Sequence, residues 1–184
     1  MVKILGISGS LRRGSFNAGL LRAAVELAAP GAQIETGTIE GIPLYNNDEE
    51  TASGVPPAVA RLKERVLANQ ALLLVTPEYN NSIPGVFKNA IDWLSRPPAD
   101  IPRILAGRPV ALIGASPGRF GTINSQTAWL TVLRALRMRP WFGGNLYVSG
   151  AASLFDAAGK LTDQPTRERL AEFLQGFAKS VAGS

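Results

Sequence analysis

The spacing of hydrophobic and polar positions along the chain predicts an alternation of strands and helices. Short apolar runs bounded by turn residues predict strands that are buried on both faces of a parallel sheet. These strands are Lys3–Ser8, Gln33–Ile39, Ala71–Val75, Arg108–Ala115 and Asn145–Val148. Longer segments with apolar residues three or four positions apart predict helices. The helices run from about Phe16 to Ala28, from Pro56 to Asn69, from Pro84 to Leu94, from about Asn124 to Met138 and from about Pro165 to Val181.

Strands that alternate with single helices imply right-handed crossovers and a parallel sheet covered on both faces. Five strands and five helices predict a flavodoxin-like α/β fold, a three-layer sandwich whose five-stranded parallel sheet has the order 2-1-3-4-5. The segment Gly41–Gly54 is polar and turn-rich, so it is expected to be an irregular surface excursion. No repeat or linker interrupts residues 1–184, and a single domain is expected. Ligands of this fold bind beyond the carboxyl ends of the strands, so the loops after strands 1, 3 and 4 should carry the chemistry.

Composition narrows that chemistry, because the 184 residues contain neither Cys nor His. Disulfides, thiolate nucleophiles, Cys/His zinc sites and His-dependent catalytic triads are excluded. Catalysis would have to come from carboxylates, Tyr or Ser, or from a bound cofactor, and an α/β chain without His favours the cofactor. The apolar runs are far shorter than a membrane span, and the N-terminus lacks the profile of a signal peptide. The chain is therefore expected to be cytoplasmic, with no membrane partner.

The charge is positive and unevenly distributed: 19 basic and 14 acidic residues give a net charge of +5. Between Ile101 and Phe155 there are six Arg and no acid, whereas acids gather at Asp48–Glu50. Such a field suits an anionic small molecule, a nucleic acid or the acidic patch of a partner subunit. Aromatic residues are sparse and no recognition motif indicates nucleic acid, so no nucleic-acid partner is expected. Pairing with acids across an oligomer interface is favoured for Arg134, Arg137 and Arg139.

The first loop, Gly9–Asn17, joins a buried strand to the N-terminus of a helix, where free amides and the helix dipole attract an anion. Four of its side chains can reach a phosphate with hydrogen-bond donors or, for the arginine, a full positive charge: Ser10, Arg12, Ser15 and Asn17. The loop is neither a Walker loop nor a Gly-x-Gly-x-x-Gly fingerprint. It is interpreted as a phosphate cradle, and the alternative is a capped helix start with a solvated Arg.

The loop Thr76–Ser82 follows the most apolar strand and can grip a flat heteroaromatic ring with an aromatic side chain, a carboxylate and amides. The alternative is an ordinary turn-rich connection. Asn81 could accept a left-handed backbone. Glu78 could act as a general base, but no second carboxylate lies nearby to form a glycosidase-type pair. The third loop, Ser116–Thr122, could present backbone amides to a negatively polarised ligand edge, or be a flexible crossover.

With these loops in place, the chain resembles the NADPH-dependent FMN reductase family, close to its quinone and chromate reductase members. Three segments carry the resemblance: GSLRRGSFN (Gly9–Asn17), TPEYNNSIPGVFKNAIDWLSR (Thr76–Arg96) and AGRPVALIGASPG (Ala106–Gly118). The resemblance covers nearly the whole chain. It implies a flavodoxin-like fold, a homodimer or homotetramer, and FMN as the cofactor.

The resemblance also implies which residues bind FMN. The phosphate contacts map onto Ser10, Arg12, Gly14, Ser15, Phe16 and Asn17. The isoalloxazine contacts map onto Pro77, Glu78, Tyr79 and Asn80, and the pyrimidine edge maps onto Ala115, Ser116 and Pro117. No side chain is assigned as a catalytic acid or base, and no metal site is expected. Three residues that border the substrate face depart from the family, which leaves acceptor preference open: Asn81, Arg119 and Phe120.

The implied function is an FMN-dependent NAD(P)H oxidoreductase with NADPH or NADH as co-substrate. Hydride passes to flavin N5, and two electrons then pass to quinones, azo compounds, chromate-type oxyanions or free flavin. The cationic segment between Ile101 and Phe155 motivates a preference for NADPH over NADH. The alternative is a flavodoxin-like FMN electron carrier without NAD(P)H turnover. Trp93 and Trp129 are expected in the core or an interface, and Lys88 and Asp92 are expected to form a surface ion pair.

Overall fold

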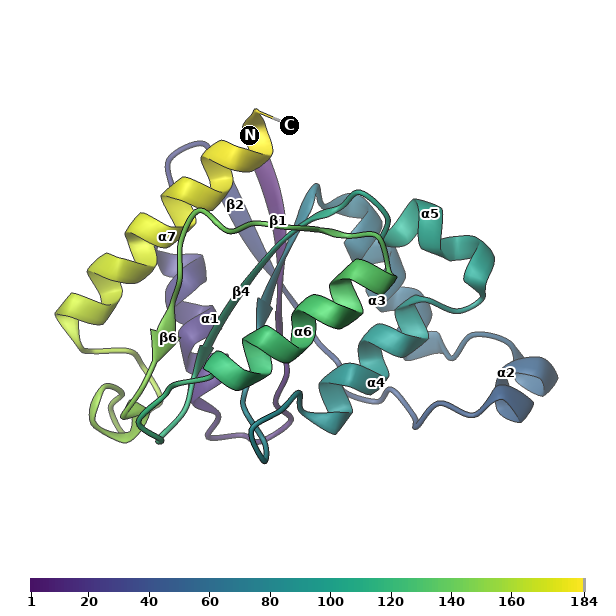
Figure 1. Ribbon diagram of the computed structural model, residues 1–184, viewed down its shortest axis with the longest axis horizontal. Helices are drawn as coiled ribbons and strands as arrows, with labels where there is room; N and C mark the ends of the chain where they lie inside the picture. Colours follow the sequence, from purple (N-terminus) through teal and green to yellow (C-terminus); the bar gives the residue numbers. More distant parts are fainter. Residues whose placement is uncertain (184) are drawn as a thin grey trace.

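The computed structural model describes residues 1–183 and confirms the predicted sandwich (Figure 1). Its sheet is parallel and has the order β2-β1-β3-β4-β5. The strands are β1 (Val2–Ser8), β2 (Ala32–Gly37), β3 (Ala71–Val75), β4 (Pro109–Ala115), β5 (Arg139–Pro140) and β6 (Tyr147–Val148). The helices are α1 (Phe16–Glu26), α2 (Asn47–Ser53), α3 (Pro57–Ala68), α4 (Gly85–Leu94), α5 (Ile101–Ile104), α6 (Ile123–Ala135) and α7 (Gln164–Ala182).

Alternate residues of the central strands enter two separate cores because successive side chains of a strand point to opposite faces. Ile4 and Leu73 pack with α1 and α7 on one face of the sheet. Leu5, Leu72 and Leu74 pack with α3, α4 and α6 on the other. Both faces are therefore dry, as the uninterrupted apolar strands predict.

The fifth strand position differs from the prediction of one strand at Asn145–Val148. Two short strands, β5 and β6, both pair with β4, and the chain between them leaves the sheet. The α6 helix also ends at Ala135 rather than at Met138, because Arg137 adopts a left-handed φ of 56°. The Met138 N–H then donates to the Leu133 carbonyl, which is the hydrogen bond of a Schellman cap.

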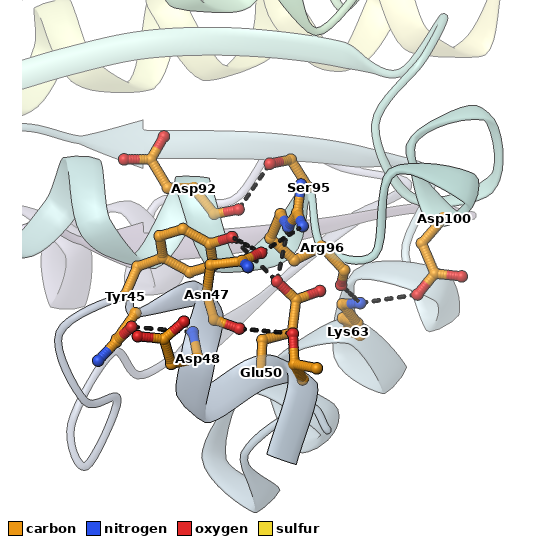
Figure 2. Close-up of polar contacts among 11 residues, drawn as sticks. Tyr45, Asn47, Asp48, Glu50, Lys63, Asp92, Ser95, Arg96 and Asp100 are labelled. Atoms are coloured by element: carbon orange, nitrogen blue, oxygen red, sulfur yellow. Dashed lines mark hydrogen bonds and ion pairs between the residues drawn. The ribbon is translucent and has the colours of Figure 1, made fainter. Parts of the chain in front are cut away.

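The segment Gly41–Gly54, predicted to be irregular, contains the short helix α2. Contacts with the end of α4 hold it in place, as Figure 2 shows. Arg96 donates through Nε to Glu50 Oε2 at 2.8 Å, and the Tyr45 hydroxyl donates to the same oxygen at 3.0 Å. The hydrogen bond from Arg96 lowers the pKa of Glu50, while burial and the bond to Glu50 raise the pKa of Tyr45. The helix therefore depends on tertiary contacts that periodicity does not reveal.

Candidate functional site

The loops after β1, β3 and β4 meet at the carboxyl edge of the sheet, as the fold requires. They enclose a pocket of about 200 Å³. The lining contains eleven of the thirteen residues that the sequence assigns to the cofactor: Ser10, Arg12, Ser15, Phe16, Asn17, Pro77, Glu78, Tyr79, Ala115, Ser116 and Pro117. Gly14 and Asn80 lie outside the lining. Three segments distant in the sequence thus converge on one concave surface.

The first loop ends in a capped helix N-terminus. Ser15 is the N-cap of α1, and its Oγ accepts a hydrogen bond from the Ala18 N–H at 3.3 Å. Arg12 donates through Nη2 to the Gly14 carbonyl at 2.5 Å, and its guanidinium lies 5.6 Å from the centroid of the Phe16 ring. Gly14, although outside the lining, therefore orients Arg12. The loop combines the amides of a helix start with a fixed cation, and it contains no acidic residue.

Asn17 connects this loop to the third one. Its side-chain Nδ2 donates to the Ala115 carbonyl at 2.9 Å, and its Oδ1 accepts from the Ala115 N–H at 2.9 Å. Asn17 is only 4% exposed and Ala115 only 2%. The amide group of Asn17 is therefore committed to the protein, so its side chain positions the pocket, and a contact with the cofactor would use its backbone.

The second loop is a tight two-residue turn. Tyr79 and Ser82 exchange backbone hydrogen bonds of 3.1 and 3.0 Å around Asn80 and Asn81. Both central residues are left-handed, with φ values of 51° and 59°, which is the arrangement of a type I′ turn. The expectation for Asn81 is confirmed, and Asn80 shares its conformation. Tyr79, which is 48% exposed, stands at the base of this turn, and Asn80 and Asn81 form its tip.

Glu78 is anchored rather than free. Its Oε2 accepts from the Ser125 N–H at 3.0 Å, in the first turn of α6, where a helix favours negative charge. Behind it lies a buried network that the sequence did not suggest. The Thr76 hydroxyl lies 2.9 Å from the Ser125 hydroxyl and accepts from Trp129 Nε1 at 3.0 Å. This network fixes the loop from below.

The third loop is tied down, so the alternative of a flexible crossover does not hold. Ser116 donates through Oγ to the Gly121 carbonyl at 2.6 Å and through its N–H to the Val148 carbonyl at 2.9 Å. The N–H groups of Ala115 and Ser116 are therefore both used within the protein, and Pro117 has none. Any backbone donors toward a ligand have to come from farther along this loop.

Two expectations about side chains outside the pocket are confirmed, one for Trp93 and Trp129 and one for Lys88 and Asp92. Trp93 and Trp129 are buried, at 1% and 0% exposure. Lys88 and Asp92 form an ion pair of 2.6 Å between half-exposed side chains. Within residues 1–183 no helix is long and apolar enough to cross a membrane, and no cluster of three metal-ligating side chains occurs.

Comparison with known proteins identifies the family. The sequence model of the NADPH-dependent FMN reductases matches residues 2–153. An NAD(P)H-dependent FMN reductase of Pseudomonas aeruginosa is 48% identical over 96% of this chain and 93% of its own length. The chain belongs to the NADPH-dependent FMN reductase family. A solved flavoenzyme NAD(P)H:(acceptor) oxidoreductase of Paracoccus denitrificans superposes with a TM-score of 0.87, at 32% identity, and covers 100% of this chain and 98% of its own.

Quinone reductases are among the relatives of this FMN reductase family member. The NADPH:quinone oxidoreductase of Arabidopsis thaliana is 38% identical over 100% of this chain and 95% of its own length. A quinone reductase of Pseudomonas putida is 41% identical over 95% of this chain and 92% of its own. Membership in a family of reductases favours the enzyme over the electron carrier.

The six arginines of the cationic segment are not among the residues that line the pocket of this family member. The first arginines lie at the opposite edge of the sheet: Arg103 pairs with Asp100 at 3.5 Å, and Arg108 donates to the carbonyls of Ile104 and Asn69. Burial lowers the pKa of Arg108. The preference for NADPH stays a prediction, but these two arginines do not carry it.

Proposed function

We propose that this chain is an FMN-dependent NAD(P)H oxidoreductase that reduces quinones by two electrons, and that azo compounds, chromate-type oxyanions and free flavin are further acceptors. The observation that carries the proposal is the single pocket in which the three loops converge at the carboxyl edge of β1, β3 and β4. Family membership supplies the cofactor and the class of reaction.

The donor set of the pocket fits a phosphate at one end. Arg12, Ser10 and the start of α1 offer a cation, a hydroxyl and helix amides, without a carboxylate in the loop. We assign these groups to the phosphate of FMN. Gly9 permits the close approach of this loop to α4, because a Cβ on Gly9 would lie 2.2 Å from the Phe87 ring. The position of the cradle is thereby set by packing.

The other end of the pocket fits a flat ring. Pro77 and Tyr79 supply apolar and aromatic surfaces from a turn whose conformation is fixed by paired backbone bonds. Bound FMN would supply the hydride and electron chemistry of the reaction. The protein orients the ring, limits access of water at its buried edge and leaves the half-exposed Tyr79 at the rim, where substrates enter. No side chain is required as an acid or base.

We further propose that the enzyme works in the cytoplasm, where NAD(P)H is available, and that it forms a homodimer or homotetramer. Large apolar side chains stand out from the surface, with Leu44 81%, Phe120 74% and Phe142 72% exposed. Such side chains are buried preferentially at protein interfaces. Light scattering coupled to size exclusion would measure the mass, and a monomer at micromolar concentration would contradict the oligomer.

Initial rates test the activity. The FMN-loaded protein should oxidise NADPH in the presence of a benzoquinone. Double-reciprocal plots of rate against NADPH at several quinone concentrations should be parallel, because NADP+ leaves before the quinone binds. Protein stripped of FMN should be inactive and should recover on reloading. A protein that binds FMN but never oxidises NADPH or NADH would be the electron carrier instead.

A further inference from the structure

Arg12, the cation assigned to the flavin phosphate, is held by two contacts. Its Nη2 donates to the Gly14 carbonyl at 2.5 Å, and its Cζ lies 5.6 Å from the centroid of the Phe16 ring. Within residues 1–183 no carboxylate pairs with it. A guanidinium carries five N–H donors in one plane, so these two contacts direct the group and leave other donors for a phosphate. The orientation of Arg12 therefore depends on where the Phe16 ring lies.

The Phe16 ring is in turn held by Phe155, which belongs to the segment between β6 and α7. The two ring centroids are 5.4 Å apart, with an interplanar angle of 44°, which is a favourable separation for an aromatic pair. Phe155 is only 8% exposed and is part of the core under α1, whereas Phe16 packs against that core and is partly buried. The buried ring thus supports the more exposed one.

Phe155 begins a short loop that runs beside the N-terminal half of α1 (Figure 1). An isolated antiparallel bridge between Phe155 and Leu161 closes this loop. Inside it, Asp156 Oδ1 accepts hydrogen bonds from the N–H groups of Ala158 and Lys160 at 2.9 and 2.8 Å. The Asp156 N–H donates to the Lys160 carbonyl at 3.0 Å. The loop is therefore a fixed unit that can hold a ring in one place.

Two residues of α1 seat this loop against the helix. Arg22 donates through Nη2 to the Gly159 carbonyl at 2.8 Å. Gly19 approaches the loop so closely that a Cβ there would lie 2.5 Å from the same carbonyl and 2.9 Å from the Phe155 ring. Glycine is unfavourable inside a helix, and this close approach explains its presence at position 19. The position of Phe155 relative to the start of α1 is thereby set by packing.

The supporting loop stands apart from the pocket that it supports. Phe155 is absent from the pocket lining, and the loop lies beyond residues 2–153, the part of the chain that matches the family model. Its route to the phosphate cradle runs through Phe16, whose ring contacts both Phe155 and Arg12. A side chain placed in this way can direct a phosphate contact without touching the cofactor.

We propose that Phe155 is a positioning residue for the phosphate of FMN. By holding the Phe16 ring it directs the Arg12 guanidinium toward the phosphate, and it thereby raises the preference of the pocket for FMN over riboflavin. The inference rests on the proposed function, which assigns the phosphate to Arg12. Riboflavin has no phosphate, so its affinity does not depend on this series of contacts.

The ratio of the dissociation constant for riboflavin to that for FMN tests the role of Phe155. Phe155→Leu keeps an apolar side chain but removes the ring, and it should lower the ratio by about two- to fivefold, the loss that corresponds to a cation–π contact at an exposed site. Quenching of flavin fluorescence measures both constants. Both flavins bind the same folded state, so a general loss of stability cancels in the ratio. A ratio equal to that of the wild type would overturn the inference.

Phe173→Leu is the matched control. Phe173 is 6% exposed, and its ring contacts Trp141 at a centroid distance of 4.9 Å, so the substitution removes a similarly buried ring away from the cradle. It should leave the ratio unchanged even where the Tm falls as far as in Phe155→Leu. An equal fall of the ratio in both variants would reduce Phe155 to a general core residue and overturn the inference.

A double-mutant cycle shows whether Phe155 acts through Arg12. In an Arg12→Gln background, Phe155→Leu should not lower the ratio further, because the guanidinium that it directs is gone. A loss of the same size in both backgrounds would overturn the inference. If Phe155→Leu does not fold, Asp156→Ala opens the same loop at an exposed residue and should lower the ratio in the same direction, and an unchanged ratio would overturn the inference.

Failure of the inference is distinguishable from failure of the proposed function. If Arg12→Gln weakens FMN and riboflavin equally, the assignment of the phosphate to Arg12 is wrong, and the role of Phe155 falls with it. If Arg12→Gln discriminates between the flavins and Phe155→Leu does not, only the inference is wrong. A protein in which both variants discriminate, but which oxidises neither NADPH nor NADH, would reject the proposed function and retain the inference.

Discussion

Asn17 and Ala115 exchange two hydrogen bonds of 2.9 Å each, although 98 residues separate them in the sequence. The amide side chain at the start of α1 occupies both backbone groups at the end of β4. The loops proposed to hold the two ends of the flavin are therefore joined by one side chain, and the shape of the pocket depends on it.

Replacing Asn17 by Ala should destabilise the fold and the pocket together. The N–H and carbonyl of Ala115 would lose their partners in a buried position, at a cost of about 2–4 kcal/mol. Urea unfolding measures the loss of stability, and FMN titration measures a parallel loss of affinity. Asn145→Ala, at an exposed asparagine, is the control and should change neither. An Asn17→Ala protein with wild-type unfolding would show that the bridge is dispensable.

Replacing Arg12 by Gln should weaken FMN much more than riboflavin. The side chain is proposed to contact the phosphate, and loss of a charge-assisted hydrogen bond corresponds to about a ten- to hundredfold loss of affinity. Riboflavin has no phosphate, so its dissociation constant should stay nearly constant. Quenching of flavin fluorescence measures both constants. An equal loss for the two flavins would move Arg12 away from the phosphate.

The kcat of Glu78→Gln should stay within about threefold of the wild type. Loss of a general base would instead lower kcat by about a hundredfold or more. The structure shows Glu78 accepting from the Ser125 N–H, and a Gln carbonyl can accept the same bond. Rates of quinone reduction between about pH 6 and 9 measure the effect. If turnover falls a hundredfold and a limb of the pH profile disappears, Glu78 moves protons after all.

The Glu50–Arg96 contact should make stability fall at acid pH. Because Arg96 lowers the pKa of folded Glu50 below its ordinary value of 4.5, the contribution is present above that value and is lost as pH falls through the folded pKa. Lys63 likewise lowers the pKa of Asp100, which adds to the same acid loss. Glu50→Gln should flatten the fall in Tm, as measured by thermal unfolding from about pH 6 to 3. Glu49→Gln, on the same helix, should keep the wild-type slope.

The sequence predicts the fold and most of the candidate site because both depend on local patterns. Apolar runs such as Ala71–Val75 and the order of helices determine the layers, and the fold rule then brings the three loops together. An Asn-Asn pair signals the tight turn at Asn80 and Asn81 through the tolerance of Asn for left-handed backbone.

What the sequence does not reveal depends on contacts distant along the chain. Helix α2 is stabilised by Arg96, 46 residues away from Glu50, and its own short polar segment shows no apolar period. The division of the fifth strand into β5 and β6 is equally invisible, because each strand has only two residues.

Anaerobic reduction tests the central claim most directly. The purified protein should show flavin absorption near ~375 and ~450 nm, and one equivalent of NADPH added without oxygen should bleach it, as a cofactor that accepts hydride requires. Addition of a benzoquinone should then restore the bands in a single turnover. Bands that persist after NADPH and NADH would contradict the account of this protein as an NAD(P)H-dependent reductase.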